Sequence, residues 1–176
     1  MLRQLRRHPD TPCDAVDSID VEVRRDDRRL ILCNRVNGQI RDIRVPAASS
    51  PTSTDQLWKH TCFEVFLRSE GDGYSEFNFS PSTEWAAYAF SGYREGMQPL
   101  THTPLPEIET EVNNNSFELR AILTLDTTAV LRLGLSAVIE ETNGRKSYWA
   151  LAHPFGKPDF HHPDCFALEL PPASGT

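Results

Sequence analysis

Short runs of alternating hydrophobic and polar residues recur along the chain, separated by Gly, Pro, Asn and Asp. Alternation with a period of two is typical of β-strands that bury one face. Helical spacing of apolar residues is hard to find, so the pattern predicts a mainly β protein. Besides an N-terminal hairpin, the expected strands are 61–68, 74–80, 84–90, 107–112, 116–124, 131–140, 145–152 and 165–170.

Two Asn-Gly pairs match the type I′ hairpin turn, whose two central residues have positive φ. Asn37–Gly38 follows strands expected at 19–23 and 30–36, and it predicts a further strand over 39–45. Asn143–Gly144 predicts a hairpin between the two strands on either side of it.

Four segments lack this alternation. Residues 46–54 are rich in Ser, Thr and Pro and are expected to form a surface loop, as a lid or crossover. Residues 127–130 suit a short helical turn. The two ends, 1–13 and 171–176, are expected to be loose.

About ten short strands at regular spacing favour an all-β fold. We expect a two-sheet antiparallel β-sandwich of the jelly-roll or immunoglobulin-like kind. A length of 176 residues suits one domain. Residues 1–176 are therefore expected to form a single domain with an ordered core at about 18–170.

Composition excludes several classes of partner. The chain has 18 Lys and Arg against 25 Asp and Glu, and its net charge of -7 repels nucleic acid. No window approaches the roughly 20 apolar residues of a membrane span, and no apolar stretch follows the basic N-terminus as it would in a signal peptide. The four cysteines form no CxxC pair, which suggests reduced thiols. These features predict a cytoplasmic protein without a membrane partner.

Alternation on strands 61–68 and 74–80 places Glu64, Glu76 and Asn78 on one sheet face. The ordinary meaning of such a face is the solvated side of an antiparallel sheet. A groove with aromatic walls and a carboxylate–amide floor instead suits a sugar-like ligand, because sugar C–H faces stack on aromatic rings and hydroxyls need fixed donors and acceptors. Aromatic residues crowd the same third of the chain, namely Trp58, Tyr74, Trp85, Tyr88 and Tyr93.

The segment 148–165 holds His153, His161 and His162 together with acidic residues. His161, His162 and Asp164 are candidate ligands for a divalent metal. The spacing matches no established ligand pattern, however, and adjacent histidines of an extended segment point to opposite sides. The alternative is a rigid, proline-rich loop whose histidines bond to the backbone.

Signatures of nucleophilic catalysis are absent from the sequence: there is no GxSxG, no glycine-rich phosphate loop and no HExxH. Glu64 and Glu76 could nevertheless act as the paired carboxylates of a glycoside hydrolase. A carboxylate- or metal-dependent hydrolase that also uses His60, Cys62 and the pair 161–162 therefore stays an alternative.

Several longer motifs carry a family resemblance. Residues 57–67 (LWKHTCFEVFL), 74–81 (YSEFNFSP) and 84–88 (EWAAY) resemble the DOMON-like superfamily. Within it, the chain is most similar to a bacterial branch related to family-nine carbohydrate-binding modules. The segments 147–154 (SYWALAHP) and 157–166 (KPDFHHPDCF) are similar to the same branch.

The resemblance implies a β-sandwich that binds a sugar or a haem in or beside one sheet. In carbohydrate-binding relatives, paired aromatic side chains clamp the sugar and polar side chains bind its hydroxyls. The ligand-binding residues expected here are Trp58, His60, Glu64, Glu76, Asn78, Trp85, Arg94, Trp149 and His153.

We therefore expect a binding domain without chemistry or cofactor of its own, whose ligand is a saccharide or sugar derivative. Many relatives are secreted modules attached to enzymes, whereas this chain shows no export signal, which favours a small intracellular ligand. Haem is the alternative cofactor, held by Met97 and a histidine or by two of His60, His153, His161 and His162. A homodimer or another protein partner, bound through an exposed aromatic patch, is a further alternative.

Overall fold

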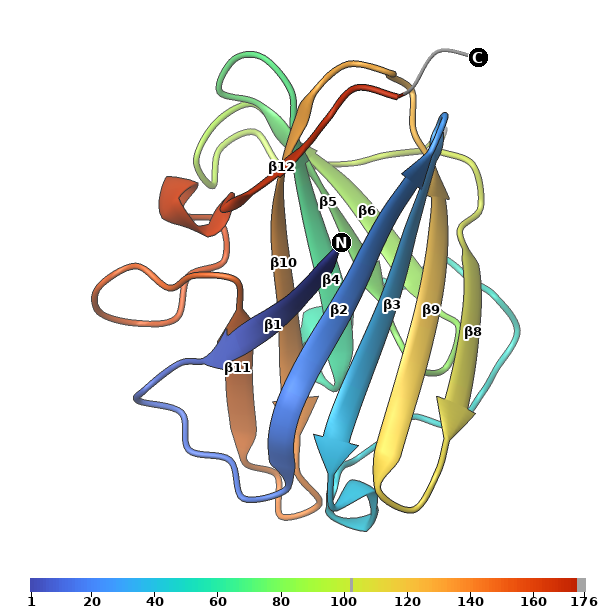
Figure 1. Ribbon diagram of the computed structural model, residues 1–176, viewed down its shortest axis with the longest axis vertical. Helices are drawn as coiled ribbons and strands as arrows, with labels where there is room; N and C mark the ends of the chain where they lie inside the picture. Colours follow the sequence, from blue (N-terminus) through green and yellow to red (C-terminus); the bar gives the residue numbers. More distant parts are fainter. Residues whose placement is uncertain (102, 174–176) are drawn as a thin grey trace.

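The computed structural model describes residues 1–101 and 103–173, and β-strands dominate it (Figure 1). In the described residues the helices are three single 3-10 turns, η1 (Ile40–Asp42), η2 (Leu57–Lys59) and η3 (Pro163–Cys165). None of these helices has the length and apolarity needed to cross a bilayer. The strands are β1 (Leu2–Arg7), β2 (Val16–Asp26), β3 (Arg29–Gly38), β4 (Cys62–Arg68), β5 (Tyr74–Phe79), β6 (Trp85–Phe90), β7 (Gln98–Pro99), β8 (Glu107–Val112), β9 (Ser116–Thr124), β10 (Leu131–Glu140), β11 (Lys146–Ala150) and β12 (Leu168–Leu170).

The strands form one curled antiparallel sheet. Their order is β7-β6-β5-β4-β10-β11-β1-β2-β3-β9-β8, with β12 paired to β10. The all-β, antiparallel prediction is confirmed, but the hydrogen-bonded path is continuous where two separate sheets were expected. β1 makes it continuous, because it pairs with β11 on one side and with β2 on the other.

The main core lies between two parts of the curled sheet that face each other. We call β4, β5, β6, β7, β10, β11 and β12 the β4 half, and β2, β3, β8 and β9 the β2 half. The fully buried rings of Phe63 on β4 and Phe117 on β9 lie 5.6 Å apart, so the two halves pack against each other. Strand β2 shows the predicted alternation, with Ile19, Val21 and Val23 all at 0% exposure in this core.

The two halves differ in their outer faces. In the β2 half the outward side chains meet solvent, as in the ion pair of Arg35 with Glu118. In the β4 half, every residue from Cys62 to Leu67 is buried. A strand buried on both faces must be covered on both, so loops have to pack on the outer face of the β4 half.

The predicted hairpin at Asn37–Gly38 is wrong. β3 ends at Gly38, and the chain turns into η1 where a strand over 39–45 was expected. Gly38 has φ +149°, and a Cβ there would lie 2.2 Å from the carbonyl oxygen of Ala15. Glycine is therefore required by close backbone packing. The second hairpin, between β10 and β11, is confirmed, but its turn is not type I′, because Gly144 has a positive φ of +86° and Asn143 does not. The Gly144 N–H donates to the Glu141 carbonyl in this turn.

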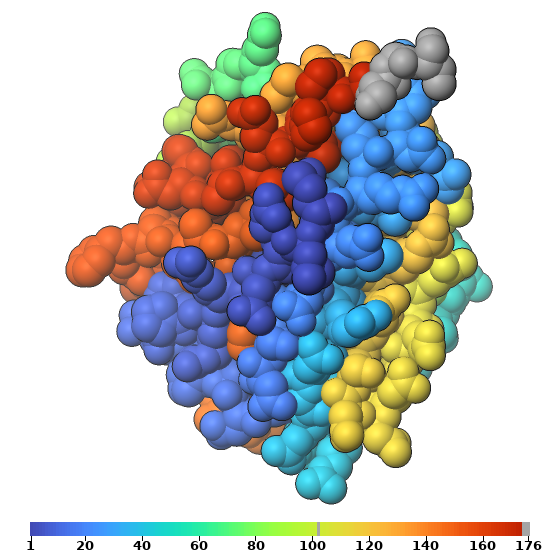
Figure 2. All heavy atoms as spheres, viewed as in Figure 1, coloured from blue at the N-terminus to red at the C-terminus, as the bar shows by residue number. Residues whose placement is uncertain are grey.

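The chain ends are more ordered than the sequence suggested. Residues 1–13 were expected to be loose and the core to begin near 18, but β1 is an interior strand, and Figure 2 shows the first residues lying between the C-terminal segments and β2. At the other end, the Pro171 carbonyl accepts a hydrogen bond from Arg25 Nη1 at 2.9 Å. The prediction for 174–176 falls outside the described residues. The stretch 127–130 is an irregular connection and not a helical turn.

Leu5 tests the place of β1 in the core, because its side chain is only 2% exposed while that of Leu2 on the same strand is 68% exposed. Leu5→Ala should lower the free energy of unfolding by about 2–5 kcal/mol through lost burial and the cavity left behind. The matched Leu2→Ala should change it by less than about 0.5 kcal/mol. Urea denaturation of both variants measures this difference, and equal effects would contradict the assignment of β1 to the core.

Candidate functional site

Three polar residues lie on the outer face of the β4 half, as the alternation predicts. Glu64 on β4 faces Asn78 on β5 in the strand register, and Glu76 lies two residues before Asn78. The face is not a solvated one, because Glu64 and Glu76 are 5% exposed and Asn78 is fully buried. These polar groups are therefore enclosed in the protein.

A cluster of aromatic rings covers one end of this face. Tyr74 and Phe90 stack with their ring centroids 4.7 Å apart. The rings of Phe66, His161 and Phe166 pack around them. Because His161 and Phe166 come from the segment between β11 and β12, the cluster fixes that segment onto the sheet.

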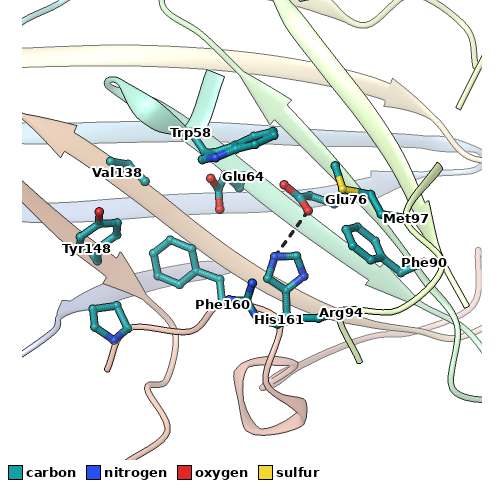
Figure 3. Close-up of a pocket in the computed structure, with 11 residues that line it drawn as sticks. Trp58, Glu64, Glu76, Phe90, Arg94, Met97, Val138, Tyr148, Phe160 and His161 are labelled. Carbon is teal, nitrogen blue, oxygen red and sulfur yellow. Dashed lines mark ion pairs between the residues drawn. The ribbon is translucent and has the colours of Figure 1, made fainter. Parts of the chain in front are cut away.

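A cavity of about 340 Å³ lies beside this cluster, on the outer face of the β4 half (Figure 3). Its size falls in the range of small-molecule sites, about 300–1,000 Å³. The ionisable side chains that converge on it are Glu64, Glu76, Arg94 and His161. The aromatic side chains that line it are Trp58, Phe90, Tyr148 and Phe160.

Burial dominates the electrostatics of the two glutamates. Loss of water raises the pKa of Glu64 from an ordinary 4.5 to about 8, and the nearby charge of Glu76 adds to the effect. Burial likewise raises the pKa of Glu76 to about 6, opposed by a hydrogen bond from Asn78 and the charge of Arg94. Ser136 Oγ donates to Glu64 Oε2 at 2.8 Å, and Asn78 Nδ2 donates to Glu76 Oε1 at 2.8 Å. One oxygen of each carboxyl is thus fixed by a protein donor.

An ion pair joins two of the loops that enclose the cavity. Arg94, after β6, contacts Asp159 Oδ1 through Nη2 at 2.7 Å and through Nε at 3.2 Å. The Tyr93 hydroxyl also donates to Asp159, and the His161 backbone N–H donates to Asp159 Oδ1 at 3.1 Å. The guanidinium is therefore held in place at the cavity wall.

His161 is neutral at pH 7. Burial, reinforced by the charge of Arg94, lowers its pKa to about 4. Its Nδ1 lies 2.7 Å from the Tyr74 hydroxyl, and its Nε2 lies 3.8 Å from Glu76 Oε2. Both ring nitrogens thus face protein groups.

The candidate metal ligands do not converge. His161 faces Glu76, whereas the ring of His162 lies against Tyr93 and its Nδ1 accepts the Asp164 backbone N–H. Within residues 1–101 and 103–173, no three His, Cys, Asp or Glu side chains are placed to hold a metal ion. The set His161, His162 and Asp164 is therefore not assembled.

One pair of the proposed haem ligands meets at the cavity. Met97 and His161 both line the cavity. To reach an iron, however, His161 would have to give up either its hydrogen bond with Tyr74 or its place beside Glu76. A haem held by Met97 and His161 would therefore replace existing contacts of His161.

Five of the nine expected ligand-binding residues do not line the cavity. One is the fully buried Asn78, which reaches the site only through its hydrogen bond to Glu76. Trp85 and Trp149 pack on the main core, on the opposite face of the sheet, and Trp149 Nε1 donates to Ser147 Oγ at 2.9 Å. His60 pairs with Glu140, its Nδ1 2.7 Å from Oε2. His153 Nε2 bonds to the Arg6 carbonyl oxygen at 2.7 Å. Of the three tryptophans expected to clamp a sugar, Trp58 is the one that lines this cavity. In the hydrolase alternative, His60 contacts Glu140, whereas His161 lies beside Glu76 and His162 beside Tyr93, so these residues do not form one site.

Several residues at the site were not predicted from the sequence, four of which bear on ligand binding. Tyr148 and Phe160 lie within the histidine-rich segment, where the histidines drew attention away from the aromatic rings. Phe90 ends β6 on the same face as Tyr88. Ser136 meets Glu64 through the β10–β4 pairing. This pairing joins parts of the chain that are far apart in sequence, so no pattern around Ser136 indicates that it contacts Glu64.

Comparison with known proteins supports the fold. The sequence matches no family model and no curated protein. The structure is similar to that of a proposed carbohydrate-binding protein from Bacteroides uniformis ATCC 8492, with a TM-score of 0.71 and 12% identity over 94% of this chain and 83% of that one. It is also similar to a family 9 carbohydrate-binding module from Caldicellulosiruptor kristjanssonii in complex with cellotriose, with a TM-score of 0.51 and 11% identity over 89% and 74%. The chain thus has a fold like that of carbohydrate-binding modules.

The raised pKa of Glu64 predicts a pH-dependent stability. A carboxyl with a pKa of 4.5 when unfolded and about 8 when folded stabilises the fold fully below pH 4.5, and this stabilisation is lost as pH rises to about 8. Across that window, wild type should lose up to about 1.4 kcal/mol per pH unit relative to Glu64→Gln, which does not titrate.

Urea denaturation at pH 5, 6.5 and 8.5 measures this loss. The control Glu169→Gln removes an exposed carboxyl on β12 and should follow wild type. If the free energy of unfolding changes with pH equally in wild type and Glu64→Gln, the burial of an unpaired carboxyl at Glu64 is contradicted.

Proposed function

We propose that this chain binds a saccharide or sugar derivative in the cavity on the outer face of the β4 half and carries out no reaction on it. The observation that carries the proposal is the convergence of aromatic side chains and positioned polar groups on one cavity of about 340 Å³. Sugars present both apolar C–H faces and hydroxyls, so they need this combination of partners.

The polar groups of the cavity are suited to hydroxyls. Glu64 and Glu76 each have one oxygen fixed by a protein donor and one left to accept a hydrogen bond from a ligand. Arg94 supplies N–H donors held in position by Asp159. At pH 7 Arg94 and Glu76 are the charged groups among these. Hydrogen bonds to charged groups contribute about 1.5–3 kcal/mol, more than those between neutral groups, so these two residues can orient a small ligand.

Trp58 is the stacking surface that we propose. It lies on η2, and its ring meets Tyr88 edge-on, with centroids 5.7 Å apart and planes at 70°. The Tyr88 hydroxyl donates in turn to Asp55, in the loop that leads to η2. The indole is half-buried and packs against Tyr88, so its position is set before a ligand binds.

We also propose that the chain is a member of the DOMON-like superfamily. The sequence runs that carry the resemblance build η2, β4 and β5, and they supply Trp58, Glu64 and Glu76 to the cavity. The two structural neighbours, described as a proposed carbohydrate-binding protein and as a module in complex with cellotriose, support a saccharide as the ligand class.

Glycoside hydrolysis is a second candidate, favoured by one observation. Burial raises the pKa of both Glu64 and Glu76, so one of these neighbouring carboxyls can stay protonated near neutral pH and serve as an acid beside the other. Incubation with nitrophenyl glycosides separates the two functions. Binding alone leaves the glycoside intact, whereas hydrolysis releases nitrophenol at a rate that Glu64→Gln and Glu76→Gln both reduce.

Two tryptophan variants test the proposed site. Wild type is first titrated calorimetrically with monosaccharides, amino sugars, uronic acids and nucleotide sugars to find the class that binds. Trp58→Ala should then weaken binding about tenfold, or about 1.4 kcal/mol, because the stacking surface is gone. Trp149→Phe should bind as wild type does, because Trp149 faces the main core. Loss of binding in a folded Trp149→Phe together with normal binding in Trp58→Ala would refute the site.

A further inference from the structure

We propose that the ligand of this cavity carries a protonated amine, as an amino sugar does, and that Glu64 and Glu76 recognise this cation. The inference rests on the proposed saccharide binding and narrows it to one chemical class. It is carried by the buried, unmatched carboxyls of the cavity and by the aromatic faces around them.

The two carboxyls have few protein partners. Glu64 is 5% exposed, and the hydrogen bond that the described residues give it comes from Ser136 to Oε2. Its Oε1 has no hydrogen-bond partner there. Glu76 accepts one hydrogen bond from Asn78 at Oε1, and its Oε2 lies 3.8 Å from His161 Nε2, too far for a hydrogen bond. Figure 3 shows both carboxyl groups pointing into the same space beside Trp58.

No protein cation forms a direct ion pair with these carboxyls within the described residues. Arg94 directs Nε and Nη2 to Asp159, so its charge is already paired. His161 is neutral at pH 7 because burial lowers its pKa to about 4. In the described part of the chain, no lysine or arginine forms an ion pair with Glu64 or Glu76. Ionisation of both carboxyls therefore leaves two negative charges unmatched in a cavity of about 340 Å³.

An ammonium group satisfies this arrangement better than a hydroxyl does. A buried charge is costly unless it is paired, and an ammonium brings both the opposite charge and three N–H donors. Aromatic faces add to the attraction, because a cation within about 6 Å of a ring centroid is stabilised by about 0.5–2 kcal/mol. Trp58, Tyr148 and Phe160 supply such faces to the cavity. An acidic sugar, by contrast, would meet like charge.

The preference for an amine depends on pH through these carboxyls. The titratable or charged groups that face them are Cys62, Tyr74, Tyr88, Arg94, Tyr148 and His161. Arg94 is the one cation in this set. A bound ammonium favours ionised carboxyls, so its binding releases protons. At pH 5 Glu76 is protonated as well as Glu64, which reduces the preference.

Matched sugars test the inference on the intact protein. Glucosamine, galactosamine and mannosamine are each compared by calorimetry with the parent hexose and the N-acetyl derivative. At pH 6.5 a sugar amine is mostly protonated, since its pKa lies near that of an α-amino group, about 8. At least one hexosamine should bind about tenfold more tightly than its parent hexose, which corresponds to about 1.4 kcal/mol. Its binding enthalpy should vary with the buffer because protons are released.

Two charge-removing variants test whether Glu64 and Glu76 cause the preference for a hexosamine over its parent hexose. Glu64→Gln and Glu76→Gln keep the size of each side chain but remove its charge, and each should reduce the ratio of hexosamine to hexose affinity towards one. Glu169→Gln, an exposed carboxyl on β12, should retain the ratio of wild type. Thermal unfolding confirms that each variant is folded, and the wild-type comparison stands by itself if one of them is not.

The outcomes separate the inference from the proposed function. Equal affinities for hexosamines and parent hexoses overturn the inference and leave saccharide binding intact. If no saccharide binds, the proposed function fails and the inference fails with it. If ethanolamine binds as tightly as any hexosamine, the site recognises an amine without a sugar, which also overturns the inference.

Discussion

Burial of β4 and β5 on both faces is the constraint on which the rest of the structure depends. Their inner faces pack into the main core, where Phe63 meets Phe117 of the β2 half. Their outer faces carry Glu64, Glu76 and Asn78, which are at most 5% exposed. Loops after β6, before β4 and after β11 must therefore cover that face. A polar floor under such a cover favours a cavity, because packing the apolar cover directly onto the carboxyls would bury polar oxygens without partners.

The cover is held by specific contacts. The ion pair of Arg94 with Asp159 joins the loop after β6 to the loop before η3. The His161 imidazole is held by its hydrogen bond with the Tyr74 hydroxyl and lies beside Glu76. These contacts set the cavity walls before a ligand arrives, and they direct the guanidinium of Arg94 to Asp159 and away from a direct pair with the carboxyls. The same packing that encloses the cavity therefore leaves its two carboxyls without a cation, which links the fold to the ligand chemistry that we propose.

Much of the strand pattern could be predicted from the sequence, because a half-buried strand alternates locally. The bounds expected for residues 107–112, 116–124 and 131–140 are those of β8, β9 and β10. The shared face of Glu64, Glu76 and Asn78 followed from the same alternation.

Features that depend on distant contacts could not be predicted in this way. β1 has apolar residues three apart, at Leu2 and Leu5, and becomes a strand because β2 and β11 pair with it on both sides. Gly38 looked like a turn residue, but it is required by the approach of Ala15, 23 residues earlier in the sequence. Trp85 was assigned to the site, yet its register partner is Phe79, whose ring belongs to the main core. Which face a tryptophan occupies therefore follows from strand pairing and not from its neighbours in sequence.

The most direct measurement of the central claim is the fluorescence of a Trp85→Phe, Trp149→Phe double variant, in which Trp58 is the sole tryptophan. Titration with the sugar class found by calorimetry should give a saturable change in emission, with the same Kd as the calorimetric binding. Binding by calorimetry without any change in Trp58 emission would place the ligand elsewhere and contradict the account.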